Sequence, residues 1–355
     1  MKNPMQSRYD CDPHFMRYSS RAISNLATIL LLTLLLVQGM TAQSNYWQFK
    51  NGGFGGFIYA IDVDSLGNVY FGSGGAGVFR TTDDGATWFQ RNKGLPFTAF
   101  IHGLIICKSG TMLVGVERQG IFRSTNGGAS WTQTLELHSM VDAFCFRSDK
   151  EVFAGSNLDE SDISMDRKNP GLYGVFRSTD DGLTWVQTNN GLASLSVQCL
   201  FVDSSKNLFA GTSNGLFRST DSGQSWANTS TGLVSMRVWS LIEPTNGTLL
   251  VGTDSGISRS TDKGGTWIKF NSGITNQFGY TPNINTFAVG HNGELFAGST
   301  EYGAFRSVNN GNSWERLNSG FSSIQIQALV ISKVGYIYAA RYSFGVYRSV
   351  LPLSH

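Results

Sequence analysis

Residues 215–226 of the chain read GLFRSTDSGQSW, and versions of this segment recur along the 355-residue sequence. Complete copies end at Trp88, Trp131, Trp185, Trp226, Trp267 and Trp314. Successive tryptophans are 43, 54, 41, 41 and 47 residues apart, so the segment is the core of a long repeat. A seventh copy, GVYRSV, begins at Gly345 and breaks off after Arg348.

Four short strands are predicted in each repeat. Residues 197–212 contain the first two, because an apolar run, a turn and a second run ending in small residues precede Gly215. The glycine-to-serine segment forms the third strand, and the fourth begins at the tryptophan and ends at a glycine turn such as Gly94. No stretch keeps helical spacing. A period of this length with four strands is typical of a β-propeller with one blade per repeat.

The two ends of the chain predict how the ring closes. Residues 47–53 follow the pattern of a fourth strand without a third strand before them, and the last repeat lacks a fourth strand. Pairing these two parts completes a blade and covers a sheet edge that would otherwise invite aggregation. The sequence therefore predicts an all-β fold over residues 43–355, a seven-bladed β-propeller of four-stranded antiparallel blades.

The repeated segment resembles the Asp-box, or bacterial neuraminidase repeat, family of β-propellers. The motif Ser-x-Asp-x-Gly-x-Ser/Thr-Trp is complete at residues 178–185, 219–226 and 260–267, and residues 81–88 differ only by Thr81 in place of serine. The second and sixth copies have asparagine at the aspartate position. From first to sixth copy, this position holds Asp83, Asn126, Asp180, Asp221, Asp262 and Asn309.

A structural role is predicted for these boxes. Aspartate or asparagine can accept hydrogen bonds from the amides of a tight turn, glycine can adopt a left-handed conformation, and tryptophan buries a large apolar face beside the hairpin. The resemblance implies the same, because boxes of this family lie on hairpins between the third and fourth strands, away from the ligand-binding face. A catalytic role of the box is the alternative.

Residues 1–42 have the features of a signal peptide. Arg17 and Arg21 precede an apolar run from Leu26 to Val37 that is too short for an ordinary membrane span, and small residues follow up to Ala42. We expect cleavage after Ala42, a possible true start at Met16, no stable membrane span after cleavage, and a secreted or periplasmic protein. An uncleaved anchor is the alternative.

The composition after residue 42 argues against several functions. It includes 23 cationic and 23 anionic side chains, so no basic excess favours nucleic acid, whose binding is largely electrostatic. Three cysteines remain, one in each of three repeats: Cys107, Cys145 and Cys199. Their odd number and their apolar neighbours indicate buried thiols and no disulfide framework. No CxxC or Cys/His spacing indicates zinc. We expect a monomer without cofactor or metal.

Two repeats are longer than the others. Residues 157–173 lengthen the connection between the second and third strands of the third repeat, and residues 274–282 lengthen the connection into the sixth. In an up-and-down blade both connections open on one face, which we expect to be functional because binding usually resides in loops on a rigid scaffold. Phe278 and Tyr280 could stack on a ligand or cover the core. The first insert carries four acidic residues, which would suit either a calcium site or a solvated loop: Asp159, Glu160, Asp162 and Asp166.

The predicted ligand site comes from an alignment of the first strands. The position just after the first valine or isoleucine is polar or aromatic in all seven: Tyr59, His102, Asp142, Gln198, Trp239, Asn285 and Gln327. Since the first strand is innermost, these side chains should face the central channel near its loop-rich mouth. Arg237, close to Trp239, completes the predicted set. Two alternatives are solvation of a water-filled channel and a catalytic acid/base pair of His102 and Asp142.

An arginine occupies one position of the third strand in every repeat: Arg80, Arg123, Arg177, Arg218, Arg259, Arg306 and Arg348. A function that requires one pocket would not require seven copies. Hydrogen bonding between strands or blades is therefore predicted, and a basic patch on one rim is the alternative.

The resemblance implies different functions in different branches of the family. Sialidases with these boxes have six blades and use three arginines at the channel mouth, whereas the aligned ring of this chain holds no arginine. Xyloglucan-type hydrolases of related repeat type have two propellers and an aspartate pair across a cleft. Neither pattern is met here, so no catalytic residue is assigned.

The chain is more similar in kind to single seven-bladed propellers such as the photosystem II stability/assembly factor, which act as binding or assembly scaffolds. Its inner strands also resemble those of periplasmic propellers in two-component sensors. We therefore expect a non-catalytic propeller that binds a protein or glycan ligand at the channel mouth. A glycoside hydrolase and a periplasmic sensor propeller are the alternatives.

Overall fold

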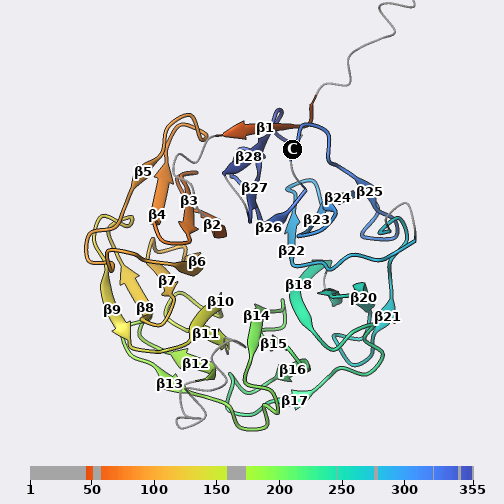
Figure 1. The fold of residues 1–355 in the computed structure, drawn as a ribbon. Coiled ribbons are helices and arrows are strands. Elements are labelled where there is room, and N and C mark those ends of the chain that lie inside the picture. Colours follow the sequence, from red (N-terminus) through yellow and green to blue (C-terminus); the bar gives the residue numbers. More distant parts are fainter. Residues whose placement is uncertain are drawn as a thin grey trace, which may run out of the picture. The chain divides into compact units, whose positions relative to one another are not determined.

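The computed structural model describes residues 45–50, 57–157, 173–245, 247–275, 279–322, 324–342 and 345–353. The chain divides into residues 1–44 and 45–355, and the second unit is described here. It is a ring of seven four-stranded antiparallel sheets around a central channel (Figure 1), which confirms the predicted β-propeller. The predicted signal peptide lies outside the described residues, as do residues 158–172 of the first insert and 276–278 of the second.

The strands of blades one to seven follow the repeats. The innermost strands are β2 (Ile58–Val63), β6 (Ile101–Ile106), β10 (Met140–Phe146), β14 (Val197–Val202), β18 (Val238–Thr245), β22 (Thr286–Val289) and β26 (Ile326–Ile331). The second strands are β3 (Val69–Ser73), β7 (Met112–Val116), β11 (Val152–Asn157), β15 (Leu208–Thr212), β19 (Thr248–Thr253), β23 (Leu295–Ser299) and β27 (Ile337–Arg341). The third strands are β4 (Gly77–Thr81), β8 (Gly120–Ser124), β12 (Gly174–Ser178), β16 (Gly215–Ser219), β20 (Gly256–Ser260), β24 (Gly303–Ser307) and β28 (Val346–Ser349). The outer strands are β5 (Phe89–Gln90), β9 (Thr132–Leu135), β13 (Val186–Gln187), β17 (Ala227–Asn228), β21 (Ile268–Lys269), β25 (Glu315–Arg316) and β1 (Trp47–Lys50).

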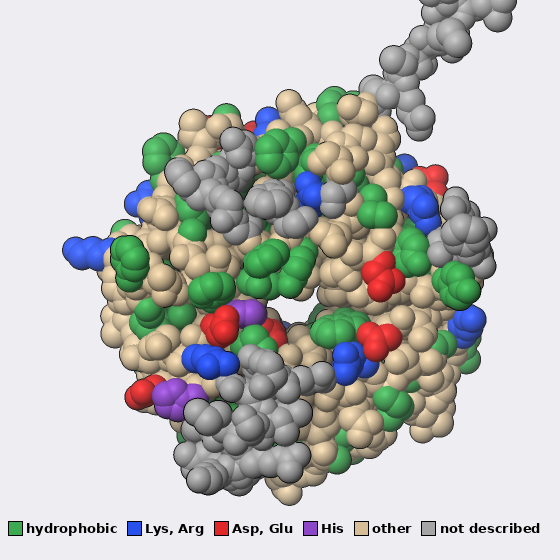
Figure 2. Space-filling model, viewed as in Figure 1, with side chains coloured by type: hydrophobic (Ala, Val, Ile, Leu, Met, Phe, Trp, Pro, Cys, Tyr) green, Lys and Arg blue, Asp and Glu red, His purple; other side chains and the backbone are tan. Residues whose placement is uncertain are grey.

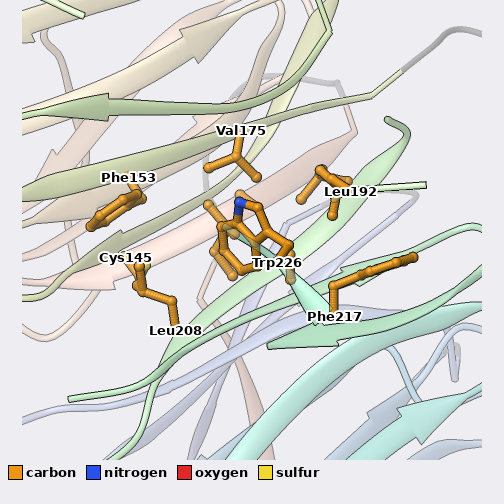
Figure 3. Packing of buried hydrophobic residues seen from close by; sticks show 11 residues of the cluster. Cys145, Phe153, Val175, Leu192, Leu208, Phe217 and Trp226 are labelled. Atoms are coloured by element: carbon orange, nitrogen blue, oxygen red, sulfur yellow. The ribbon is translucent and has the colours of Figure 1, made fainter. Parts of the chain in front are cut away.

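The hydrophobic core lies between the blades. The second strand of each blade is buried along all or nearly all of its length, as LFAGT of β15 is, because both of its faces pack against neighbouring blades. One cluster joins Phe153 and Val175 of blade three to Leu208, Phe217 and Trp226 of blade four (Figure 3). Each sheet is therefore stabilised by its neighbours in the ring.

The first and last strands of the propeller meet in blade seven. Strand β1 pairs with β28, with Trp47 opposite Ser349 and Lys50 opposite Val346. The indole Nε1 of Trp47 donates to the carbonyl of Leu317 (2.6 Å), and its ring stacks on Phe321 with 4.6 Å between centroids. The predicted closure of the ring is confirmed.

The outer strands are shorter than predicted. Strand β17 begins at Ala227, one residue after the tryptophan, and has only two residues. The backbone amide of Trp226 donates to the carbonyl of Asn190 in blade three (2.8 Å). Trp47 donates in the same way to Ser319, yet β1 begins at Trp47, so this bond alone does not set where the strand begins. The prediction that the fourth strand begins at the tryptophan is wrong in blades one to six, where the strand begins one residue later, and right for β1.

Side-chain hydrogen bonds close the box turn of blade four, residues 219–226. The hydroxyl of Ser219 donates to Asp221 Oδ1 (2.7 Å) and accepts from the amide of Gly223 (2.9 Å). Asp221 also accepts from the amide of Ser225 (2.9 Å). The Ser225 hydroxyl also donates to Asp221. Of the bonds that lower the pKa of Asp221 to about 2, this one has the largest effect. Ser222 and Gly223 have left-handed φ values of 61° and 79°, which the turn requires.

The box tryptophans contact the preceding blade. The indole Nε1 of Trp226 donates to the carbonyl of Thr188 in blade three (2.9 Å), and Trp131 and Trp267 make equivalent bonds to Arg91 and Thr229. Four of the six are buried, whereas Trp88 and Trp185 are half-buried. This geometry is that of a scaffold element between blades.

The repeated arginines bond within and between blades. Three reach the next blade: Arg123 donates to Asp181 (2.6 Å), Arg259 to Asn312 (3.2 Å) and Arg348 to the carbonyl of Asp84 (3.3 Å). Within a blade, Arg177 binds Glu151 and Arg306 binds Glu294. Arg80 and Arg218 lie over the rings of Tyr70 and Phe209. Five of the seven arginines therefore make the predicted hydrogen bonds between strands or blades.

The three cysteines of the described chain are free. Cys107 and Cys145 are buried and Cys199 is half-buried, and burial raises the pKa of the Cys199 thiol to about 12. Cys107 follows strand β6 and does not lie within it. In the part of the chain that the structure describes, no helix has the length and apolar character that a membrane span requires.

Asp62 of β2 joins blade one to blade two and leads to a prediction about pH. Its carboxylate accepts from the amides of Val63 and Ile106 (both 2.8 Å), but burial outweighs these bonds and raises its pKa to about 6. Because the pKa is higher in the folded than in the unfolded state, this group contributes stability that is full below about pH 4 and is lost as the pH rises through about 6.

We therefore expect Asp62→Asn to remove this pH dependence. Between pH 4 and pH 7, the free energy of unfolding of the variant relative to the wild type should rise by about 2 kcal/mol. Urea denaturation at several pH values measures this difference. Asp149→Asn is the control, since Asp149 is exposed in a turn. Parallel pH profiles of the Asp62→Asn variant and the wild type would contradict the assignment.

Candidate functional site

The seven aligned ring residues lie together around one cavity of about 480 Å³. Every blade contributes one of them: Tyr59, His102, Asp142, Gln198, Trp239, Asn285 and Gln327. The cavity lies at the end of the channel where the inner strands begin, which we call the upper mouth. Figure 2 shows the channel opening in the middle of one face, with a histidine and with acidic and hydrophobic side chains around it.

A bulge in the inner strand positions the ring residue in six of the blades. The pairing of β2 with β3 skips Tyr59, and that of β6 with β7 skips His102 in the same way. Equivalent register shifts occur at Asp142, Gln198, Trp239 and Gln327. Because a bulged residue is released from the ladder, its side chain can be aimed away from the regular pleat. Sequence alignment found these residues but gave no sign of the bulge.

His102 is held between two carboxylates. Its Nε2 lies 3.1 Å from Glu117 Oε2 and its Nδ1 lies 3.4 Å from Asp142 Oδ1. The ring of Tyr59 stacks on the imidazole with 4.5 Å between centroids. Burial opposes protonation, but the hydrogen bonds and charges of Asp142 and Glu117 outweigh it, so the pKa of His102 is raised. Only an imidazolium can donate to both carboxylates at once.

Glu117 was not among the residues that the sequence indicated. It follows strand β7, and its amide donates to the carbonyl of Phe100 (2.9 Å), which places it beside the start of β6. The sequence signal that could have found it is its position directly after the second strand. Asn157 holds the same place in the third blade, and it too was missed.

Asn157 connects blade three to blade four. Its Nδ2 donates to Asp142 Oδ2 (3.2 Å) and to Gln198 Oε1 (3.1 Å), and its Oδ1 accepts from the hydroxyl of Ser196. The network therefore fixes the side chains of two ring residues before any ligand binds. Such preorganisation lowers the conformational cost of binding.

Trp239 forms the wall of the cavity in blade five. Its Nε1 donates to Asp254 Oδ1, and the guanidinium of Arg237 lies over its ring at 5.7 Å from the centroid. Arg237 does not line the cavity, although it was predicted with the ring, and its Nε lies 3.9 Å from Asp254 Oδ2. It therefore supports the Trp239 ring without lining the cavity.

Asn285 and Gln327 complete the ring in blades six and seven. The Nδ2 of Asn285 donates to the carbonyls of Ile326 (2.9 Å) and Gln327 (2.8 Å), so this amide joins the two blades. Its Oδ1 is buried and has no hydrogen-bond partner among the described residues.

An aromatic patch borders the upper mouth on blades seven and one. The rings of Phe57 and Tyr342 lie 4.6 Å apart, and Tyr342 meets Tyr59 edge to face at 6.1 Å. Phe57 and Tyr342 are each 41% exposed, which is uncommon for neighbouring aromatic side chains. The sequence did not single them out, because both lie in connections whose geometry only the folded ring sets.

The chemistry of the upper mouth favours recognition. Glu117 and Asp142 share one imidazole, so each carboxylate already has a side-chain partner. Asp142 lines the cavity, and around it stand amide groups, flat aromatic rings and, deeper in, aliphatic side chains. Among the described residues, no three His, Cys, Asp or Glu side chains are grouped to hold a metal ion. The acidic residues of the first insert and Phe278 lie outside the described residues, whereas Tyr280 is exposed.

Comparison with known proteins shows similarity in structure. No family model matches the chain, and no curated protein matches it. The extracellular domain of a putative one-component system from B. thetaiotaomicron superimposes with a TM-score of 0.67 at 20% identity, over 86% of this chain and 40% of that one. The chain thus spans less than half of that sensor domain.

Two other solved structures have the same fold. YCF48 bound to D1 peptide matches with a TM-score of 0.67 at 13% identity, over 87% of this chain and 96% of that one. The GH74 xyloglucanase from Xanthomonas campestris matches with a TM-score of 0.66 at 15% identity, over 86% of this chain and 53% of that one. At these identities the likeness shows the fold alone. The chain is a seven-bladed β-propeller similar in fold to YCF48, to the extracellular domain of a putative one-component system and to a GH74 xyloglucanase.

Proposed function

We propose that this protein is a secreted or periplasmic, non-catalytic binding propeller that holds a segment of a partner protein at the upper mouth. The observation that carries the proposal is the cavity itself, to which each of the seven blades contributes a different polar or aromatic side chain. A ring that served only the scaffold would repeat one residue, as the third-strand arginine does. Variation at a shared position is what recognition of one ligand requires.

The side chains of the ring suit an extended peptide. Gln198 and Gln327 bear amides, which both donate and accept, and a peptide backbone offers both kinds of partner. Tyr59 and Trp239 offer flat faces for apolar side chains. The YCF48 structure, which has a similar fold, was solved with a D1 peptide bound, and this supports a peptide as the ligand class. No photosystem partner is inferred for this chain.

Substitutions in the ring test the proposal. A peptide library screened against residues 43–355 identifies a binding peptide, and its affinity is then measured for Trp239→Ala and Asp142→Asn. We expect Trp239→Ala to weaken binding about 30-fold, as truncation of an aromatic interface anchor does. Asp142→Asn should weaken it about tenfold, because the amide lacks the charge and has one acceptor oxygen for the two partners, His102 and Asn157.

Phe89→Ala is the matched control, since Phe89 is an exposed aromatic residue on outer strand β5, away from the cavity. It should bind like the wild type. Equal affinities for all four proteins would place the peptide elsewhere. Binding restricted to a glycan array, or turnover of chromogenic glycosides that Asp142→Asn abolishes, would replace this proposal by a glycan-binding or hydrolytic function.

A further inference from the structure

The central channel changes character below the polar ring. In blades two, three and four, the residues two positions after the ring residue line the same cavity and are apolar: Leu104, Phe144 and Leu200. Two positions further along each strand come Ile106, Phe146 and Val202. Because alternate residues of a strand share one face, these side chains continue the inner wall of the channel away from the upper mouth. The wall is therefore polar at one end and apolar at the other.

A second cavity of about 520 Å³ opens where these three strands end, at what we call the lower mouth. Phe144 and Leu200 line both cavities, so they separate the two. Ile106, Phe146 and Val202 are half-buried: each packs in part against a cluster between blades and also lines this cavity. A cavity of this volume lies within the range that protein ligand sites occupy.

The rim of the lower mouth is basic. Lys108, Arg147 and Lys206 line it from blades two, three and four, and Asp149 is the one carboxylate in its described lining. Arg147 Nε donates to the carbonyl of Lys206 (3.0 Å), and Lys206 Nζ donates to the carbonyl of Arg147 (3.4 Å). These reciprocal bonds fix two of the cationic residues to each other across a blade boundary.

Glu151, which is half-buried, offsets only part of the charge of this rim. Glu151 accepts from Arg147 Nη1 (2.8 Å) and also binds Arg177 Nη2 (2.7 Å), so one carboxylate serves two guanidinium groups. Glu243 of the next blade is engaged by the amide and hydroxyl of Ser204. Among the described residues that line the cavity itself, three cations therefore stand against one carboxylate.

We propose that the lower mouth binds an amphipathic organic anion, an apolar chain that ends in a carboxylate or phosphate. The chain would lie against Ile106, Phe146 and Val202, and the anionic head would meet Lys108 and Lys206 at the rim. A neutral apolar ligand would leave the basic rim unused, and an inorganic anion would leave the apolar wall exposed to water. Only a ligand with both parts satisfies both halves of the cavity. This site is separate from the peptide site proposed at the upper mouth.

Calorimetric titration with decanoate, octanoate and decanol tests the proposal. Each buried methylene group strengthens binding up to about fourfold, so decanoate should bind about tenfold more tightly than octanoate. Decanol should bind about tenfold more weakly than decanoate, because it lacks the charge that the rim attracts. The double variant K108Q/K206Q should bind decanoate about tenfold more weakly than the wild type and should bind decanol equally well. Both lysines are exposed, so the fold should be unaffected.

Lys333→Gln is the matched control. Lys333 occupies in blade seven the same type of turn as Lys108 in blade two, since Gly335 donates to Ser332 as Gly110 donates to Cys107, but it does not line the cavity. Its decanoate affinity should equal that of the wild type. No binding of decanoate to the wild type, or equal losses in K333Q and K108Q/K206Q, would overturn the proposal. Trp239→Ala should bind decanoate normally, and a loss there would place the anion at the upper mouth.

Discussion

Replacing Trp47 by alanine should lower the free energy of unfolding by about 3–5 kcal/mol, as truncation of a large buried aromatic residue does. Trp47 is 1% exposed and is part of the cluster that packs blade six against blade seven. The variant also loses the bond from the indole to Leu317 and the stacking on Phe321. Since β1 holds the two ends of the propeller together, the loss should appear as one cooperative transition at lower urea concentration.

Gln48→Ala is the control on the same strand, because Gln48 is exposed while its backbone still pairs with Arg348. It should change stability by less than about 0.5 kcal/mol. Removing residues 45–50 altogether should lower stability more than the Trp47 substitution, because it uncovers the edge of β28. The exposed edge should also promote aggregation. A truncated protein that stays monomeric with an unchanged melting temperature would show that the closure does not stabilise the ring.

The number of blades and their closure could be predicted because repetition carries the information. A strand pattern that returns seven times specifies the architecture even where a single copy is ambiguous, as the GISRS segment of β20 is. The start of the outer strand could not be predicted. Trp226 has the character of a strand residue, yet its amide bonds to the preceding blade, and no local pattern records a contact with Asn190.

The candidate site was predictable only at positions that recur. The ring residues share an alignment column, so their common place at the channel followed from the repeat. Glu117 and Asn157 act through side-chain contacts that no alignment column records: Glu117 bonds His102 within blade two, and Asn157 reaches Gln198 across the boundary to blade four. The aromatic patch of Phe57 and Tyr342 joins residues that are far apart in sequence. Nothing in one sequence indicates such pairs, because they depend on closure of the ring.

Trp226→Ala should also lower the free energy of unfolding by about 3–5 kcal/mol. Its indole is 5% exposed and lies in the cluster between blades three and four, among Val175, Leu192 and Phe217 (Figure 3). The substitution leaves a cavity in that cluster and an unpaired carbonyl at Thr188, which lost its indole donor. Chemical denaturation measures the loss, and the peptide affinity of the folded fraction should stay within about twofold of the wild type.

Trp88→Ala is the comparison that separates burial from the motif itself. Trp88 occupies the same box position in blade one, but it is half-buried, and its Nε1 has no hydrogen-bond partner among the described residues. If packing between blades determines the loss of stability, Trp88→Ala should lower the free energy of unfolding about half as much as Trp226→Ala. The reason is that the substitution of Trp88 removes less buried apolar surface. Equal losses at the two positions would mean that the box turn itself depends on the indole. A Trp226→Ala variant that kept its stability but no longer bound peptide would instead make the box part of the ligand site.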